Sequence, residues 1–474
     1  MNSDAFTGGL PIGGGSSPFS LGTQARGSAH SYIDPDLNAT QLDVQENEAT
    51  SVIPKTTRSE LAIHGGRPAF SKVQHVGCPV VLNPESFMTR IQGVLDRQWF
   101  TNNGQEVQEF ESRIEQLLGV KHCVATSNGT SALTLTAQAL GLKGEVILPS
   151  FTFIATAHAF SSIGLRPVFA EVDSSTACID ARAVRSLVNE NTAAIVGVHL
   201  WGRTCDVAAL EDLSEESQVP LLFDASHAFG VTHSGKYVGN FGQAETFSFH
   251  ATKYISAGEG GAVTTNSDEL ASRLRAARNF GFTGVDSVES LGTNAKLNEL
   301  CAALGNASLE TLDQRVAINR RNFAVYRELL ADIDGIHLQD VKQTERNNYQ
   351  YVVIRICPET FGCDRDALLT ALEAENVRAR RYFYPGCHRA QPYAEDFNAQ
   401  GRDLPGTDRL ANEVLSLPTG PAVSVKSVQA IVSIIAVLAK NSDNCKQDGE
   451  RQSQNVVPIP KSIASRPTRR GSLF

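Results

Sequence analysis

Lys253 is the residue whose type and surroundings point most directly to chemistry. It ends the stretch FSFHATK at 247–253, and the glycine-rich stretch GEGG follows at 258–261. A lysine at the exit of a strand, among small and hydroxyl residues, can hold its amine where it loses a proton and attacks an aldehyde carbon. Glycines next to it allow the backbone to pass close to a bulky, planar cofactor. The stretch therefore predicts a Schiff-base lysine.

Asp224 supplies the second half of this pattern. It ends the apolar stretch PLLFD at 220–224, 29 residues before Lys253. Pyridoxal phosphate (PLP) needs a carboxylate against its ring nitrogen, because the protonated ring then acts as an electron sink. Alone, a lysine is usually solvated and a strand-end aspartate often caps a helix. In this order and spacing, the two residues predict a PLP enzyme with Lys253 and Asp224 as its catalytic residues.

The surrounding motifs resemble the DegT/DnrJ/StrS family, PLP-dependent aminotransferases that act on nucleotide-linked keto sugars. The resemblance covers residues 60–440, in the family's order. Its motifs are TNNG at 101–104, SNGTSAL at 127–133, FTFIAT at 151–156, VHLWG at 198–202, DASHAFG at 224–230, SFHATK at 248–253, GEGG at 258–261, GTN at 292–294 and RYFYPGCH at 381–388.

Apolar stretches alternate with amphipathic ones through the first part of the chain. We expect strands at 122–126, 145–148, 166–172, 193–199, 219–224, 244–249 and 261–265, and helices at 107–118, 131–140, 156–162, 180–187, 207–216 and 268–277. This alternation predicts an α/β fold with a mostly parallel sheet, whose ligands gather at the carboxyl ends of the strands. A helical stretch from Leu297 to about Leu330 leads to a mixed segment suited to a smaller α+β domain. The resemblance implies a fold type I PLP-dependent transferase.

The chain is expected to have two folded domains and two tails. We expect a PLP-binding large domain at 61–310 and a small C-terminal domain at 311–440. Residues 1–60 and 441–474 lack a hydrophobic period, and we expect disordered tails there, the second one basic.

The sequence just after the strand expected at 122–126 predicts a binding site for the cofactor phosphate. Gly129, Thr130 and Ser131 stand at a helix start, where backbone N–H groups and hydroxyls suit an anion, although such a start is often only a capped helix. The resemblance implies four further cofactor contacts: Ser248 with the phosphate, Phe153 on the face of the ring, His227 beside the cofactor, and Asn294 reaching the phosphate of the partner subunit. Read without the family, Phe153 suits a core position, His227 a hydrogen-bonded structural role and Asn294 a turn after Gly292.

The arginine-rich run at 378–384 is expected to approach the substrate. The resemblance places Arg381, Tyr382 and His388 near the sugar nucleotide, and the planar guanidinium of arginine suits a diphosphate. A charged run of this kind is also typical of a solvated surface. Lys296 stands where many relatives have arginine, so its contact is open.

The function implied is the transfer of an amino group from glutamate to a 3- or 4-keto group of a nucleotide-linked deoxy sugar, for polysaccharide, glycan or natural-product biosynthesis. Two alternatives stay open: a descendant that binds PLP or sugar without turnover, and another PLP reaction such as dehydration. Some relatives that dehydrate carry histidine in place of the lysine, so Lys253 favours amino transfer. The resemblance also implies a homodimer with composite active sites.

Composition excludes several other classes. The net charge of −9 argues against a nucleic-acid binder. Nine scattered cysteines without a Cys-x-x-Cys motif support neither a metal site nor a disulfide framework, and they favour a reducing cytoplasm. No apolar stretch approaches the ~18 residues of a membrane span, and Val428–Leu438 reads as a core helix.

Overall fold

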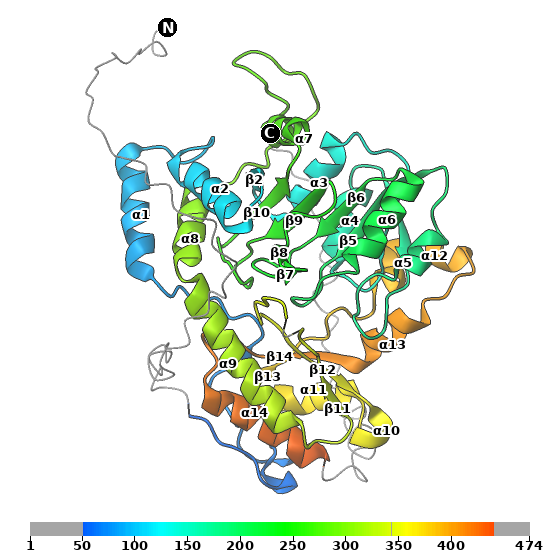
Figure 1. The fold of residues 1–474 in the computed structure, drawn as a ribbon. Coiled ribbons are helices and arrows are strands. Elements are labelled where there is room, and N and C mark those ends of the chain that lie inside the picture. Colours follow the sequence, from blue (N-terminus) through cyan, green and yellow to red (C-terminus); the bar gives the residue numbers. More distant parts are fainter. Residues whose placement is uncertain (1–50, 343, 440–474) are drawn as a thin grey trace, which may run out of the picture. The chain divides into compact units, whose positions relative to one another are not determined.

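A seven-stranded sheet organises the larger half of the protein. The computed structural model describes residues 51–342 and 344–439, and these belong to one compact unit. The sheet has the order β2-β10-β9-β6-β5-β3-β4 (Figure 1). All its pairs are parallel except those of β10, which runs antiparallel to β2 and β9. The strands are β2 (His122–Thr126), β3 (Glu145–Pro149), β4 (Arg166–Ala170), β5 (Thr192–Val198), β6 (Leu221–Asp224), β9 (Ala244–Ser248) and β10 (Gly261–Thr265).

The strands match the seven predicted ones to within two residues at each end. They are buried along almost their whole length, because helices cover both faces of the sheet. A strand buried on both faces must be nearly all apolar, so its ends coincide with the change in composition. This arrangement confirms the predicted α/β class with a mostly parallel sheet.

Most helices of this half begin at a residue whose side chain caps them, whereas α2 and α4 have no such cap. The side chains of Asn128, Asp206 and Ser267 accept hydrogen bonds from backbone N–H groups in the first turns of α3, α6 and α7. These bonds satisfy donors that a helix start leaves free. The helices are α1 (Pro84–Arg97), α2 (Gln105–Leu118), α3 (Gly129–Ala139), α4 (Ile154–Ser161), α5 (Ala181–Arg185), α6 (Val207–Ser217) and α7 (Asp268–Arg278), and a short hairpin joins β7 (Thr232–His233) to β8 (Lys236–Tyr237).

The stretch from 297 to 330 forms two helices, α8 (Glu299–Glu310) and α9 (Leu312–Leu330). They separate at Thr311, whose φ of −107° and ψ of 17° leave the helical region. The second helix leads from the large sheet to the C-terminal half (Figure 1). No helix among the described residues is long and apolar enough to cross a membrane.

The C-terminal half is built on a three-stranded antiparallel sheet with the order β11-β12-β14. Its core joins these strands to α9, α11 and α14, and α14 contains the predicted core helix at 428–438. The elements are β11 (Ile336–Leu338), β12 (Val352–Ile356), α10 (Pro358–Phe361), α11 (Arg365–Ala374), β13 (Val377–Arg378), α12 (Gln391–Ala399), α13 (Pro405–Glu413), β14 (Val414–Leu417) and α14 (Val425–Ala439).

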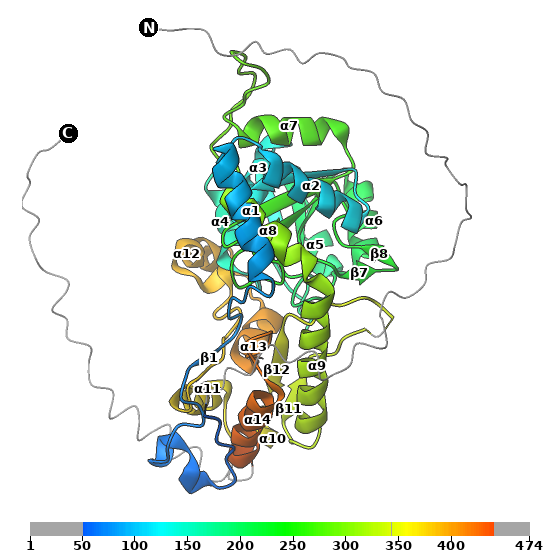
Figure 2. The ribbon, with the colours of Figure 1, turned by 90° about the vertical axis from the view of Figure 1, so that its left-hand side faces the viewer.

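The first described residues, 51–75, pack into this C-terminal half rather than onto the large sheet (Figure 2). Strand β1 (Gln74–His75) pairs in parallel with β13, and Leu61 and Phe70 are fully buried in the same core as β12 and β14. The predicted disordered tail is therefore wrong for residues 51–60, since Val52 pairs with Phe70 and Lys55 is buried. The remaining parts of the predicted tails, 1–50 and 441–474, lie outside the described residues. The other boundaries, near 310 and 440, stay predictions.

A buried ion pair fastens this segment. Lys55 Nζ lies 3.4 Å from Glu375 Oε2, and both side chains are at most 2% exposed. The two Glu375 oxygens also accept hydrogen bonds from the backbone N–H groups of Ala62 and Ala69, each at 2.6 Å. One carboxylate at the end of α11 thus holds three points of the N-terminal segment.

Glu375→Ala is expected to lower the free energy of unfolding by about 3–5 kcal/mol, because it leaves the Lys55 ammonium buried without a countercharge. Chemical denaturation of the two proteins measures the difference. Glu373→Ala is the matched control, since Glu373 is exposed on the same helix. Equal unfolding midpoints for the two variants would show that the ion pair does not hold the segment.

Candidate active site

A cavity of about 690 Å³ opens at the carboxyl ends of β5, β6 and β9, where the two halves of the protein meet. Helix starts of α3 and α4 line one side, and side chains of the C-terminal half close the other. Nine of the predicted site residues line it: Gly129, Thr130, Ser131, Phe153, Asp224, His227, Ser248, Lys253 and Tyr382. Residues from 129 to 382 are therefore brought together at one place in the fold.

Asp224 is the last residue of β6 and is only 6% exposed. Its Oδ2 accepts a hydrogen bond from the Thr156 hydroxyl at 2.9 Å, and its Oδ1 accepts one from the Ser226 N–H at 3.1 Å. These bonds fix the plane of the carboxylate at the floor of the cavity. A buried carboxylate held in this way is ready to pair with a cation that enters the cavity.

Lys253 follows β9 in a turn closed by a hydrogen bond from its own N–H to the His250 carbonyl at 2.8 Å. Its partly exposed surface lines the cavity. Burial among protein atoms lowers the pKa of Lys253 to about 8, although the nearby charge of Asp224 opposes the shift. The amine therefore loses its proton far more easily than a surface lysine does, which is what a nucleophilic amine requires.

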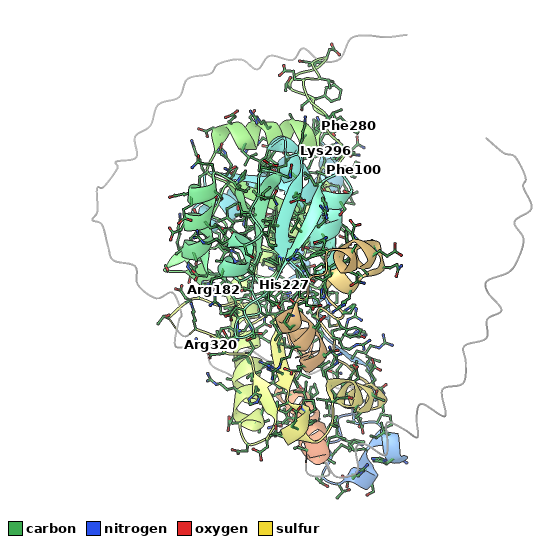
Figure 3. All side chains as sticks on the ribbon, turned by 90° about the vertical axis from the view of Figure 1, so that its right-hand side faces the viewer. Phe100, Arg182, His227, Phe280, Lys296 and Arg320 are labelled. Carbon is green, nitrogen blue, oxygen red and sulfur yellow. The ribbon has the colours of Figure 1, made fainter. Side chains whose placement is uncertain are left out.

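His227 lies at the junction of the two halves (Figure 3). Its ring centroid is 4.4 Å from that of Tyr351 and 5.8 Å from that of Phe383, with a tilt of only 20° to the latter. Burial lowers the pKa of His227 well below its usual value, and the charge of Lys253 lowers it further, so the ring is neutral at pH 7. Its buried Nδ1 has no hydrogen-bond partner among the described residues. A flat, neutral ring with a free nitrogen at the cavity wall suits contact with another planar ring.

The start of α3 forms the anion-binding end of the cavity. Asn128 Oδ1 accepts the Ser131 N–H at 2.8 Å, and a helix start leaves further N–H groups of its first turn without intrahelical acceptors. A Cβ added to Gly129 would lie 2.9 Å from the Ser248 Cβ. Glycine at 129 is therefore what allows the helix start and the Ser248 hydroxyl to approach the same point.

Three predicted residues lie elsewhere. Asn294 is exposed next to the loop that leaves α7, bridged to Asn279, and does not line the cavity. Arg381 lines an adjoining cavity of about 350 Å³, where Asp366 Oδ1 accepts its hydrogen bond at 3.1 Å. His388 is fully buried and lines neither cavity.

The surroundings of His388 explain its position. Its Nδ1 lies 2.6 Å from the Ser150 hydroxyl, and its Nε2 lies 3.1 Å from Asp408 Oδ1. The side chain thus joins the end of β3 to α13 inside the protein. This placement favours a structural role over contact with a substrate.

Sequence reasoning missed several residues of the cavity. Thr156 stands inside the FTFIAT motif, yet only the structure shows that its hydroxyl meets Asp224. Tyr351 and Arg380 come from the C-terminal half, and Arg380 lines both cavities. Arg380 could have been predicted from its position in the arginine-rich run, whereas the sequence around Tyr351 does not indicate that it lines a cavity.

The donor set fits PLP. An amine of lowered pKa, a buried carboxylate and a helix start suited to an anion surround one cavity, and these are the groups that its aldehyde, ring nitrogen and phosphate need. The unpartnered His227 Nδ1 is a further polar atom that a bound ring system can approach.

The sequence of the chain is similar to those of known aminotransferases. The model of the DegT/DnrJ/EryC1/StrS aminotransferase family matches residues 83–436. A dTDP-4-amino-4,6-dideoxy-D-glucose transaminase of Shigella dysenteriae is 35% identical over 74% of this chain and 95% of its own length. A GDP-perosamine synthase of Vibrio cholerae is 33% identical over 74% of this chain and 94% of its own.

Solved structures share the fold as well. DesI, solved in the presence of its TDP-sugar product, superposes with a TM-score of 0.77 at 43% identity, covering 84% of this chain and 99% of its own. Helicobacter pylori PseC, an aminotransferase involved in the biosynthesis of pseudoaminic acid, gives a TM-score of 0.73 at 28% identity, over 78% of this chain and all of its own. The predicted PLP cofactor and aminotransferase class are thereby confirmed. With its cavity, its lysine–aspartate pair and these relatives, the chain belongs to the DegT/DnrJ/EryC1/StrS aminotransferase family.

Proposed function

We propose that this protein transfers an amino group from glutamate to a 3- or 4-keto group of a nucleotide-linked deoxy sugar. The observation that carries the proposal is the placement of Lys253 and Asp224 in one cavity with the first turn of α3. Relatives that match over most of their length make 4-amino sugars on dTDP and perosamine on GDP. Another match is a 3-amino-3,6-dideoxygalactose transaminase of Aneurinibacillus thermoaerophilus, so both positions of the ketone are represented.

Each cavity residue has a proposed role toward the cofactor. When bound, PLP supplies an aldehyde to hold the amino group and a ring that accepts electrons. Lys253 Nζ would hold the aldehyde and would take up and return the proton of the substrate carbon, a task that its lowered pKa suits. Asp224 would pair with the ring nitrogen. Gly129, Thr130, Ser131 and Ser248 would hold the phosphate, while Phe153 and His227 would contact the ring.

We propose that the adjoining cavity of about 350 Å³ receives the nucleotide diphosphate. It shares Phe153, Arg380 and Tyr382 with the cofactor cavity. Asp366 accepts a hydrogen bond from Arg381, whereas the Arg380 guanidinium has no carboxylate partner among the described residues. A free guanidinium at the wall between both cavities suits a diphosphate that continues into a sugar.

The test is to incubate the protein with isotopically labelled glutamate and a panel of UDP-, dTDP- and GDP-linked keto sugars, and to analyse the products by mass. Transfer of the labelled nitrogen to one sugar supports the proposal and identifies the substrate. Absorbance separates the alternatives: a cofactor band that glutamate converts indicates amino transfer. A band that no amino acid moves favours a protein that binds without turnover, and loss of a sugar hydroxyl without nitrogen transfer favours dehydration.

We also propose a homodimer that works in the cytoplasm. Large apolar side chains are exposed in two segments of the large half: Trp99 and Phe100 between α1 and α2, and Phe280, Val285 and Leu291 between α7 and α8. Val285 is 93% and Leu291 91% exposed, and such clustered exposure is typical of a surface covered by another chain. Phe100, Phe280 and Lys296 lie together at one edge of the large half (Figure 3), with Lys296 Nζ 4.7 Å from the Phe280 ring centre. Asn294 belongs to the same surface, so a second copy can receive it at its cofactor site.

Mixing a Lys253→Ala chain with an Asn294→Asp chain is expected to restore activity that neither homodimer has. One site of each heterodimer then combines an intact lysine with an intact asparagine, and random exchange gives about a quarter of the wild-type turnover. The Asn294→Asp homodimer should bind PLP weakly, because the new carboxylate repels the phosphate. Turnover after mixing is the measurement.

Asn398→Asp is the control for the added charge, because Asn398 is exposed on α12 and outside both cavities. It should keep normal PLP affinity. A protein that sediments as a monomer at the assay concentration and still turns over normally would contradict the composite site.

A further inference from the structure

Two side-chain amides of the C-terminal half reach the loops that carry the proposed cofactor residues. They are Asn348 and Gln350, in the connection between β11 and β12. We call this pair the amide clamp. Asn348 is 1% exposed, whereas Gln350 is half-buried.

Asn348 holds the loop of His227. Its Nδ2 donates hydrogen bonds to the carbonyl oxygens of His227 at 3.1 Å and of Phe229 at 3.2 Å. Its Oδ1 accepts the N–H of Gln350 at 3.1 Å. All strong hydrogen-bonding groups of this amide are therefore used, and two of the bonds fix the backbone on either side of Ala228.

Gln350 holds the loop of Lys253. Its Nε2 donates to the carbonyl oxygen of Thr252 at 3.1 Å. That carbonyl belongs to the peptide bond that leads into Lys253, so the bond restrains the backbone from which the lysine side chain starts. The next residue, Tyr351, lines the cavity and packs its ring 4.4 Å from His227.

The clamp is itself held in place. Asn319 of α9 donates from Nδ2 to the Asn348 carbonyl at 3.0 Å. The neighbouring Asn347 donates to the Gly202 carbonyl at 2.5 Å and accepts the Tyr349 N–H at 2.7 Å. The segment that carries Asn348 and Gln350 is therefore anchored by bonds of its own. It can restrain the loops of His227 and Lys253 rather than move with them.

We propose that Asn348 and Gln350 are positioning residues of the transamination: through main-chain carbonyls they fix the His227 ring and the Lys253 amine relative to each other across the cavity. They touch neither cofactor nor substrate, since neither lines the cavity. The inference rests on the roles proposed above for Lys253 and His227.

The decisive experiment compares Gln350→Met with Gln339→Met, both loaded with PLP. Gln339 is the matched control, because its Nε2 also donates to a large-half carbonyl, that of Trp201 at 3.1 Å, from the same β11–β12 connection. Methionine keeps the length and removes the donor in both cases. Gln350→Met is expected to lower kcat roughly 10- to 100-fold, since small misplacements of reacting groups cost that much, while KM for glutamate stays within about threefold.

Two further readouts distinguish positioning from simple stability. Gln350→Met is expected to weaken PLP binding and to shift the pH midpoint at which the absorbance of bound PLP changes, because that midpoint depends on where the Lys253 amine sits. Gln339→Met should leave both unchanged. Thermal unfolding of the PLP-free proteins should be similar for the two variants, since each loses one hydrogen bond to a main-chain carbonyl. Gln350→Met also loses a longer contact, 3.4 Å from Gln350 Nε2 to the Tyr351 hydroxyl.

Asn348→Leu and Asn322→Leu form a second pair. Asn322 is equally buried and also donates to two carbonyls, those of Gly420 at 3.3 Å and Val423 at 3.0 Å, within the C-terminal half. Both variants should be less stable than the wild type. Only Asn348→Leu should also have a lower kcat, measured at a temperature at which both variants are folded. Asn348 is deeply buried, so its variant can fail to fold. In that case, the comparison of Gln350→Met with Gln339→Met tests the proposal.

The proposal is overturned if Gln350→Met lowers kcat no more than Gln339→Met does and leaves the absorbance midpoint unmoved. Failure of the proposed function is a separate result, since it would show in the wild-type protein as an absence of nitrogen transfer from glutamate. The two failures are therefore distinguishable.

Discussion

Lys253→Ala is expected to abolish amino transfer while the protein keeps its fold. Within the described part of the chain, the Lys253 amine has no hydrogen-bond or ion-pair partner on which the fold depends, and burial has already lowered its pKa to about 8. Loss of a group that both binds the cofactor and moves the substrate proton should lower kcat by at least about 10³-fold, since proton transfer alone contributes 10²–10⁴-fold. Single-turnover assays with glutamate measure the effect.

Lys253→Arg is the matched control for charge. It keeps a cation in the cavity but offers no amine that deprotonates near neutral pH. It should therefore be as inactive as Lys253→Ala, and both should unfold at temperatures close to the wild-type one. Turnover above a small fraction of the wild-type rate in either variant, without added amines, would remove Lys253 from its proposed role.

Asp224→Asn is expected to lower kcat by roughly 10²–10³-fold, the usual cost of losing one fixed electrostatic contact to the reacting system. The amide keeps the shape of the carboxylate. Its oxygen can still accept the Ser226 N–H, and its nitrogen can donate to the Thr156 hydroxyl, so the fold and part of the PLP affinity should persist. An uncharged amide cannot stabilise a protonated ring nitrogen, and the reaction should slow for that reason. Steady-state kinetics and titration with PLP measure both effects.

Asp206→Asn serves as the control for this change. Asp206 caps α6 by accepting the Ala209 N–H, a task that asparagine performs equally well, and it lies outside the cavity. Its variant should match the wild type in rate and in PLP binding. An Asp224→Asn protein as fast as this control would show that Asp224 is structural and that the proposed orientation of the cofactor is wrong.

The strands and the centre of the site could be predicted from the sequence because one physical rule governs both. Strands of a parallel sheet are apolar throughout, so their ends are visible as changes in composition. Asp224 ends β6 and Ser248 ends β9. Since carboxyl ends of parallel strands meet at one edge, the motifs that follow them had to converge.

Residues contributed by the C-terminal half could not be predicted in the same way. Tyr351, Arg380 and the amide clamp act across a contact between segments about a hundred or more residues apart, and no local period reports such a contact. His388 shows the converse case. Its type suited a substrate contact, yet a buried histidine serves equally well to join partners such as the buried Ser150 and the partly exposed Asp408.

The pairing of β1 with β13 has a consequence for how the chain is made. His75 lies beside Arg378, so the first described segment can be buried only after the ribosome has added 303 more residues. At a synthesis rate of 5–20 residues per second, roughly 15–60 s pass between the synthesis of Leu61 and Phe70 and that of their core partners, and the whole large sheet is synthesised in between. For that interval the nascent chain carries an unpaired apolar segment ahead of a nearly complete domain. An expression fragment trimmed to the family match at 83–436 would lack that segment and leave the core of the C-terminal half open.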